Sequence, residues 1–220
     1  MIGLLYKDQM VIWSGYRKNF ILLVLLYSAM AFTMDTPFML FALLFVGGMY
    51  TTSTLVFDEQ SHWDAYARTL PLSPGQIVGA KYLLALGWMG GLFVLVEFLL
   101  TLCDLFKGHM TENLAYNLSG CLITLGLVMA YYALSYLLSY KIGAVRARSG
   151  VILAIALIIA IAFVGSETVE TVADPLFRAA PALSETAVLF LVTGGSLAVG
   201  LVLFLLSWKI STQIYTKKEY

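Results

Sequence analysis

Six long apolar runs constrain this chain more than any other feature of its sequence. Most of them approach the ~20 residues that a helix needs to cross a bilayer core ~30 Å thick. The runs are continuous rather than alternating, which argues against the strands of a membrane barrel. All five prolines lie between runs, where a missing backbone donor costs least. The expected transmembrane helices are Phe20–Met34, Phe38–Phe57, Ile77–Cys103, Leu114–Tyr140, Val151–Gly165 and Ala187–Trp208.

The charge content agrees with a polytopic membrane protein. Only 12% of the residues are charged, against about 25% in an ordinary soluble domain. The formal net charge is zero, which gives no indication of a nucleic-acid partner. The sequence therefore predicts an all-α integral membrane protein with six spans, in contact with the lipid bilayer and forming a single domain over residues 1–220.

Lys and Arg residues are distributed unevenly between the two sides of this topology. All but two of the 13 fall on the side that carries both termini, and the two exceptions are Lys107 and Arg178. Because cytoplasmic loops carry the excess of positive charge, both termini are expected in the cytoplasm. Ala29-Met30-Ala31 has the pattern of a signal-peptide cleavage site, but a charged 18-residue segment precedes the run, so we expect no cleavage.

Residues 1–18 predict an amphipathic helix. Its apolar and aromatic side chains recur near one helical face, together with the start of the first span: Ile2, Leu5, Ile12, Trp13, Tyr16 and Phe20. The charged residues of this segment fall mostly on other faces. Such a helix lies in the cytoplasmic membrane interface before the chain turns into the bilayer. A frayed amphipathic terminus is the alternative.

The polar stretch after the second run predicts a short helix over residues 58–71. Its apolar positions have the i, i+3, i+4, i+7 spacing of one helical face: Trp63, Tyr66, Ala67 and Leu70. Ser61 and Asp64 have the spacing of a capping box, and Pro71 ends the pattern. Ser73-Pro74-x-Gln76 then predicts a capped start for the third span. A cytoplasmic helix and an interfacial helix anchored at the headgroups both fit this pattern.

Two segments resemble the cytoplasmic loops of small bacterial permeases, the six-span membrane subunits of type-2 ABC exporters. The first is D-E-x-x-x-W-x-x-Y-x-x-T-L-P-x-S-x-x-x-I-V-x-x-K-Y, which runs from Asp58 to Tyr82. The second is Tyr140-Lys141-Ile142-Gly143-x-x-Arg146. In that family the first loop forms the coupling helix, which docks into a groove of a separate ATP-binding subunit. By position, the docking residues here would be Glu59, His62, Trp63, Asp64, Tyr66 and Arg68.

The resemblance implies a multi-pass protein of the bacterial plasma membrane that works as a dimer with two ATP-binding subunits. The chain itself lacks the G-x-x-x-x-G-K-[ST] loop that surrounds nucleotide phosphates. We therefore expect no catalytic residue, metal or cofactor on this chain, with ATP and magnesium bound by the partner.

The expected cargo is amphipathic or hydrophobic, because the spans offer little fixed charge. A six-span member of the family exports amphipathic cytolytic peptides, the phenol-soluble modulins, and this chain is similar to it in size and layout. An amphipathic peptide of antimicrobial or cytolytic type is therefore the expected substrate. The alternatives are a drug or lipid exporter permease, an ATP-independent channel, and an intramembrane enzyme. An enzyme fits worst, because both histidines, His62 and His109, lie in loops.

Candidate pathway residues are the polar groups inside the runs: Thr51, Thr52, Ser53, Glu97, Tyr132 and Tyr136. Helical hydroxyls often bond only to a carbonyl of the preceding turn, and tyrosines often belong to an aromatic belt, so these alternatives stay open. Glu97 is the one carboxylate inside a run, which usually marks function. It lies ~22 Å along the helix from Tyr82, where it could also reach the outer headgroups.

Small residues at four-residue spacing predict close helix contacts, favoured within one subunit. They are Gly75-x-x-x-Gly79, Gly87-x-x-x-Gly91 and Ser196-x-x-x-Gly200. Cys103 and Cys121 are expected to be free packing thiols rather than a disulfide. Residues 166–186 are expected to form the longest extracellular loop, either as a short helix on the outer leaflet or as an irregular cover.

Overall fold

Long helices account for nearly all of the described chain. The structure, a computed structural model, describes residues 1–34, 38–67, 69–108, 110–150 and 185–217, and these contain no strand. Residues 144–150 are helical as well. The other helices are α1 (Ile2–Met34), α2 (Phe38–Gln60), α3 (Trp63–Ala67), α4 (Pro74–Lys107), α5 (Met110–Ile142) and α8 (Glu185–Lys217).

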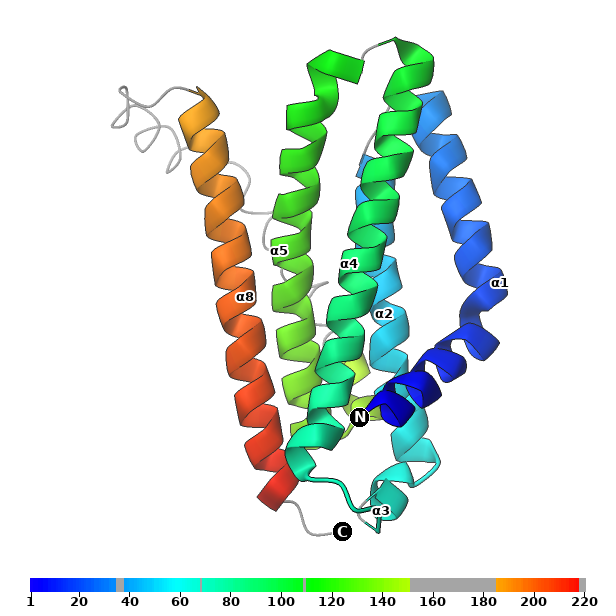
Figure 1. Cartoon of the computed structure of the whole chain (residues 1–220), viewed down its shortest axis with the longest axis vertical. Helices are drawn as coiled ribbons and strands as arrows, with labels where there is room; N and C mark the ends of the chain where they lie inside the picture. The colour runs from blue at the N-terminus through cyan, green and yellow to red at the C-terminus, as the bar shows by residue number, and fades with distance from the viewer. Residues whose placement is uncertain (35–37, 68, 109, 151–184, 218–220) are drawn as a thin grey trace.

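The long helices run side by side along one axis of the molecule (Figure 1). Helix α4 packs against α1, α2, α5 and α8, and α5 and α8 pack on each other over their length. The short helix α3 lies at the lower end, the same end as the N-terminus and the end of α8 (Figure 1). The predicted cytoplasmic elements are therefore gathered at one end of the bundle.

Three helices of the described chain have the length and hydropathy of a membrane span. They are Pro74–Lys107, Tyr116–Ile142 and Phe190–Lys217, and they overlap the predicted third, fourth and sixth spans. The predicted first and second spans are helical but are not among these three. The fifth, Val151–Gly165, and almost all of loop 166–186 lie outside the described residues. The all-helical membrane fold is thus confirmed, whereas the number of six spans stays a prediction.

Helix α1 differs from its prediction, because the expected interfacial helix and first span form one continuous helix. Figure 1 shows that its first part lies oblique to the bundle and that the rest runs up beside α2 and α4. Helices bend readily at Gly/Ser pairs, and Ser14-Gly15 is such a pair in the first half of α1.

Two of the three small-residue patterns make close contacts within the chain, as predicted. A Cβ on Gly126 or Gly200 would overlap backbone of the facing helix, so α5 and α8 touch backbone to backbone. A Cβ on Gly79 would lie 3.1 Å from the ring of Trp208 in α8. Gly87 and Gly91 differ, because nothing lies within 4 Å of a Cβ at either position. The Gly87-x-x-x-Gly91 prediction of a close intramolecular contact is therefore wrong for the described residues.

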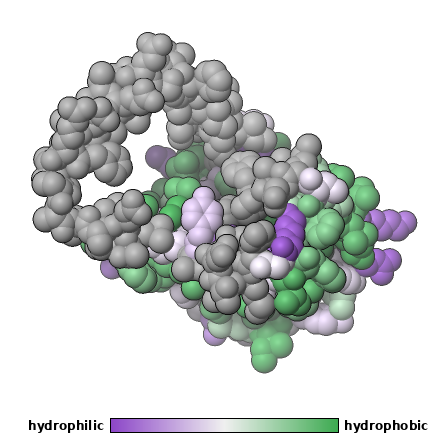
Figure 2. All heavy atoms as spheres, turned by 90° about the horizontal axis from the view of Figure 1, so that it is seen from above, coloured by the Kyte–Doolittle hydropathy of each residue, from purple (hydrophilic) through white to green (hydrophobic). Residues whose placement is uncertain are grey.

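Apolar side chains cover much of the outside of the bundle. Seen from above, the described surface is largely hydrophobic, with few hydrophilic groups (Figure 2). Helix α8 contributes Phe190, which is 78% exposed, and also exposes Val199 and Leu206. Exposed leucine, valine and phenylalanine side chains on several helices are typical of a surface that faces lipid.

Candidate functional site

The first cytoplasmic loop turns sharply between α2 and α3. Helix α2 continues to Gln60, three residues beyond the predicted end at Phe57, and α3 begins at Trp63. His62 turns the chain with a positive φ of 52°, which is uncommon for a residue with a side chain. Ser61 donates its hydroxyl to the carbonyl of Phe57 at 2.8 Å and so belongs to the end of α2. The predicted capping box between Ser61 and Asp64 is therefore wrong, because the longer α2 places Ser61 one residue before the cap position.

The predicted capped start of the third span is confirmed at the start of α4. Ser73 is the N-cap, its side chain accepts a hydrogen bond from the Gln76 backbone, and the Gln76 side chain accepts one from the Ser73 backbone. Pro74 occupies the first turn. The loop that carries α3 is therefore attached to a membrane helix whose first residue is fixed by reciprocal hydrogen bonds.

Four charged side chains from three helices meet beside α3, and we call them the charge cluster: Lys7 and Asp8 of α1, Asp58 of α2 and Lys81 of α4. The Nζ of Lys81 lies 2.8 Å from Oδ1 of Asp8 and 2.5 Å from Oδ2 of Asp58. The Nζ of Lys7 lies 2.9 Å from Oδ1 of Asp8 and 2.6 Å from Oδ1 of Asp58. Each cation thus bridges both acids, and the cluster is neutral as a whole.

Because its charged side chains are buried, the charge cluster is costly to break apart. Asp8 is 1% exposed, Lys81 4% and Asp58 8%. A buried charge is tolerated only when it is paired, and removal of one partner from a buried pair costs about 3–5 kcal/mol. Separating α1, α2 and α4 at this point would leave such charges without their partners. The cluster therefore holds the three helices together at the cytoplasmic end.

Lys7 also connects the charge cluster to α3. Its Nζ lies 4.2 Å from the centroid of the Trp63 ring, a cation–π contact. The ring of Trp63 packs in turn on Tyr66, with centroids 5.2 Å apart. Ala67 is fully buried, while Tyr66 is 56% exposed. Helix α3 therefore has one face attached to the bundle and one face open to solvent.

The second cytoplasmic loop is attached to the first through Glu59. One carboxylate oxygen of Glu59 accepts hydrogen bonds from the backbone amides of Ala144 and, at 3.1 Å, Val145. These amides begin the helix over residues 144–150, so Glu59 caps its N-terminus with a negative charge. Gly143 precedes them with a φ of 94°, which favours glycine. A side chain there would also collide with Glu59, because a Cβ would lie 2.7 Å from Oε1.

Next to the charge cluster, Tyr82 connects α4 to α5 and α8. Its hydroxyl makes hydrogen bonds with Ser207 at 2.7 Å and Ser211 at 2.9 Å. Ser207 donates to the carbonyl of Ala133 at 2.6 Å, and the Tyr82 ring meets Tyr136 edge-on at 4.9 Å. Adjacent residues of α4, Lys81 and Tyr82, thus contact all the other long helices of the described chain.

The predicted docking residues are found in different environments. His62 and Tyr66 are exposed, and Trp63 and Asp64 are half-buried beside them. Glu59 has an exposed side chain, but its carboxylate is engaged with the second loop. Arg68 lies outside the described residues. A cavity of about 220 Å³ separates the two loops and is lined by side chains of both, among them Glu59, His62, Asp64 and Tyr140.

The predicted pathway hydroxyls lie inside the packed bundle. Thr51, Tyr132 and Tyr136 are fully buried, and Ser53 is 5% exposed. Each hydroxyl of α2 bonds to a carbonyl of its own helix: Thr51 to Gly48, Thr52 and Ser53 to Met49, all at 2.9 Å. These three hydroxyls are therefore satisfied within their own helix, which is the alternative to pathway lining that the sequence left open. The hydroxyls of Tyr132 and Tyr136 are buried without a hydrogen-bond partner in the described part of the chain.

Glu97 is half-buried on α4, and its Oε1 has no hydrogen-bond partner among the described residues. It interacts with the buried thiol of Cys121 on α5. Cys121 and Cys103 are both free thiols, as expected. The described residues contain no group of three His, Cys, Asp or Glu side chains that could hold a metal ion.

The charge cluster is the feature that sequence reasoning missed. Asp58 and Lys81 belonged to the loop resemblance, and Lys7 and Asp8 were placed away from the apolar face of an interfacial helix. A partial signal was present, because Asp58 directly follows the second run and Lys81 lies in the first turns of the third. Nothing in the sequence, however, gives the rotation of each helix about its axis, which decides whether these side chains point inward.

Comparison with known families gives one match. A family described as "ABC-2 family transporter protein" matches residues 3–216, nearly the whole chain. The comparisons with curated proteins and with solved structures found no match.

Proposed function

The chain belongs to the ABC-2 family of transporter membrane proteins, and from this membership we propose that it is the permease subunit of an ATP-driven exporter. Family membership implies a permease that pairs with an ABC ATP-binding subunit. Two copies of the chain would form the pathway and bind two copies of that subunit. Nucleotide and magnesium would be held by the ATP-binding subunits.

The observation that carries this proposal is the attachment of α3 to the charge cluster. A force applied to α3 reaches α1 through Trp63 and Lys7, and it reaches α2 and α4 through Asp58 and Lys81. A buried ion pair resists separation, because moving either partner away leaves an uncompensated charge. Motion of the loop is therefore passed to three membrane helices rather than absorbed locally.

The docking surface for the ATP-binding subunit is the solvent-exposed face of α3, with Tyr66 and His62 as its contact residues. Tyrosine supplies a large contact area at low entropic cost and is enriched at binding hot spots. The capping of residues 144–150 by Glu59 supports a wider surface, because it makes both cytoplasmic loops move together.

The proposed cargo is an amphipathic peptide of antimicrobial or cytolytic type, with a drug or a lipid as the alternatives of the same class. The support is the low charge of the membrane helices together with the buried hydroxyls of Tyr132 and Tyr136. Separation of α2 and α5 would expose these hydroxyls along an otherwise apolar surface. An amphipathic molecule can use both kinds of group. The proposed membrane is the bacterial plasma membrane, with both termini in the cytoplasm.

Exchange of Tyr66 for alanine tests the docking surface. We expect Tyr66→Ala to weaken the complex with the ATP-binding subunit about tenfold, the loss of a moderate hot spot of ~1.4 kcal/mol. The measurement is affinity by titration of the labelled subunit onto the permease in nanodiscs. Tyr116→Ala is the matched control, since Tyr116 is exposed at the opposite end of the bundle. Equal affinity of both variants would contradict docking on α3.

A further inference from the structure

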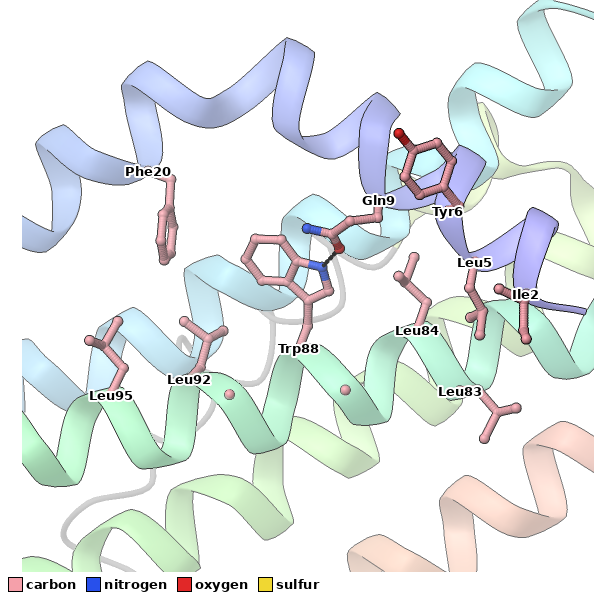
Figure 3. A pocket seen from close by; sticks show the side chains of 12 residues that line it. Ile2, Leu5, Tyr6, Gln9, Phe20, Leu83, Leu84, Trp88, Leu92 and Leu95 are labelled. Carbon is pink, nitrogen blue, oxygen red and sulfur yellow. Dashed lines mark hydrogen bonds between the residues drawn. The ribbon is translucent and has the colours of Figure 1, made fainter.

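An open apolar groove lies between the oblique first part of α1 and the middle of α4. It has a volume of about 600 Å³. Figure 3 shows Leu5 of α1 with Leu84 near one end, Phe20 of α1 with Leu92 and Leu95 at the other, and Trp88 between them. Gly87 and Gly91 form the floor on α4, and a side chain at either position would meet open space. The bend of α1 keeps the two helices apart at this point, which explains the gap.

The walls of the groove offer a ligand almost nothing polar. Gln9 is the one amide among the lining residues, and its Oε1 already accepts a hydrogen bond of 2.9 Å from Nε1 of Trp88 (Figure 3). The other lining residues are aliphatic, aromatic or glycine. Burial of polar groups without partners is costly, so a sugar, nucleotide or ion is a poor occupant. The groove is suited to a hydrocarbon.

The length of the groove suits an extended hydrocarbon chain. From Leu84 to Leu95 it follows α4 for about 17 Å, at 1.5 Å per residue. Its walls are apolar over this length, so an acyl chain that lies along α4 meets hydrocarbon groups from one end of the groove to the other.

The position of the groove points to a phospholipid as the source of that chain. Gly87 and Gly91 are exposed, so the groove opens to the outside of the bundle, where α4 faces the bilayer. It follows α4, a membrane-spanning helix, and its end at Ile2 and Leu83 lies toward the cytoplasmic side. A lipid of the inner leaflet can therefore enter sideways, with its chain parallel to α4.

We propose that the groove between α1 and α4 is a binding site for one acyl chain of an inner-leaflet phospholipid. The acyl chain packs under the part of α1 that carries Lys7 and Asp8. It therefore supports the charge cluster from the membrane side. This site does not depend on the identity of the cargo or on the docking of an ATP-binding subunit. It requires that the chain lies in a bilayer with the proposed orientation, in which the N-terminus is cytoplasmic.

Native mass spectrometry of the full chain, extracted from phosphatidylethanolamine and phosphatidylglycerol vesicles in a mild detergent, tests the proposal. Gly91→Leu fills the groove, and Gly87→Leu does so independently. Gly90→Leu is the matched control, because Gly90 is also exposed with open space around it but does not line the groove. A Cβ at each of the three positions would meet nothing within 4 Å, and leucine raises helix propensity, so all three variants are expected to fold.

We expect the wild type and Gly90→Leu to retain a bound phospholipid after detergent exchange. Gly91→Leu and Gly87→Leu should lose most of it. Their lipid-bound fraction should be at least fivefold lower, which corresponds to a loss of roughly 1 kcal/mol of binding free energy. Equal retention by all four proteins would overturn the proposal. Adducts with the mass of a free fatty acid or of detergent in place of phospholipid would overturn it as well. Neither outcome bears on docking at α3, which the Tyr66 titration tests separately.

Discussion

The two ends of the helix bundle are connected in different ways. At the end that carries α3, predicted to be cytoplasmic, four charges from α1, α2 and α4 form a buried cluster, and Glu59 joins the two loops. At the opposite end, predicted to be the outer one, the described helices are joined by hydrogen bonds and ring contacts. Asn117 of α5 donates to Asp104 of α4 at 2.6 Å, and Lys107 donates to the carbonyl of Ala31 in α1 at 3.3 Å.

This difference indicates which part of the permease moves as a unit. A hydrogen bond to a charged group contributes about 1.5–3 kcal/mol net, whereas removal of a partner from a buried ion pair costs about 3–5 kcal/mol. Among the described contacts, separation of helices is therefore cheaper at the outer end than at the end that carries α3. For the proposed exporter this asymmetry is useful, because the end proposed to meet the ATP-binding subunit would transmit motion and the other end would open.

The largest effect is expected for Lys81→Met, which removes the cation that is shared by Asp8 and Asp58 inside the protein. We expect its free energy of unfolding to fall by about 3–5 kcal/mol, measured by denaturant titration in mixed micelles. The double variant Asp8→Asn with Lys81→Met leaves one acid and one base and should recover part of the loss. A Lys81→Met variant as stable as the wild type would show that the cluster does not hold the helices together.

A smaller effect is expected for Glu59→Gln, which leaves the side chain length but removes the charged cap of residues 144–150. We expect a loss of about 1 kcal/mol, together with faster hydrogen exchange at the amides of Ala144 and Val145. Gln60→Ala, at the exposed neighbouring position, is the control. Unchanged exchange at these two amides would mean that the loops are joined by other contacts.

An effect below that of Lys81→Met is also expected at the outer end, for Asn117→Ala. Loss of its hydrogen bond to the carboxylate of Asp104 should cost about 1.5–3 kcal/mol, against about 3–5 kcal/mol for Lys81→Met. The measurement is the same denaturant titration. If Asn117→Ala destabilises the protein as much as Lys81→Met, the two ends do not differ and the asymmetry is refuted.

Local features of the fold could be read from the sequence because they depend on a few neighbouring residues. The capped start of α4 at Ser73 follows from spacing alone, and it is confirmed. The contact of Ser196-x-x-x-Gly200 with another helix was also predictable, because small residues permit close approach. The same rule failed for Gly87 and Gly91, since the bend of α1 that leaves them uncovered is a tertiary feature.

The site was less predictable than the fold. Lys81 and Asp8 are 73 residues apart in sequence, and only the packing of α1 on α4 brings them together. The amphipathic pattern placed the charged side chains of residues 1–18 away from the apolar face, and it gave no sign that Asp8 is buried. Glu59 shows the same limit, because its bond to residues 144 and 145 depends on how two loops are placed.

The most direct test of the account is whether the cytoplasmic end moves as one body when the ATP-binding subunit binds ATP. Spin labels at Ala65→Cys, an exposed position of α3, and Trp13→Cys report the distance between α3 and α1, and labels at Phe32→Cys and Tyr116→Cys report the outer end. Both pairs are placed in a background without Cys103 and Cys121 and diluted with unlabelled copies. The account predicts an unchanged α3–α1 distance and a changed outer distance on addition of ATP. A changed α3–α1 distance with a constant outer distance would contradict it.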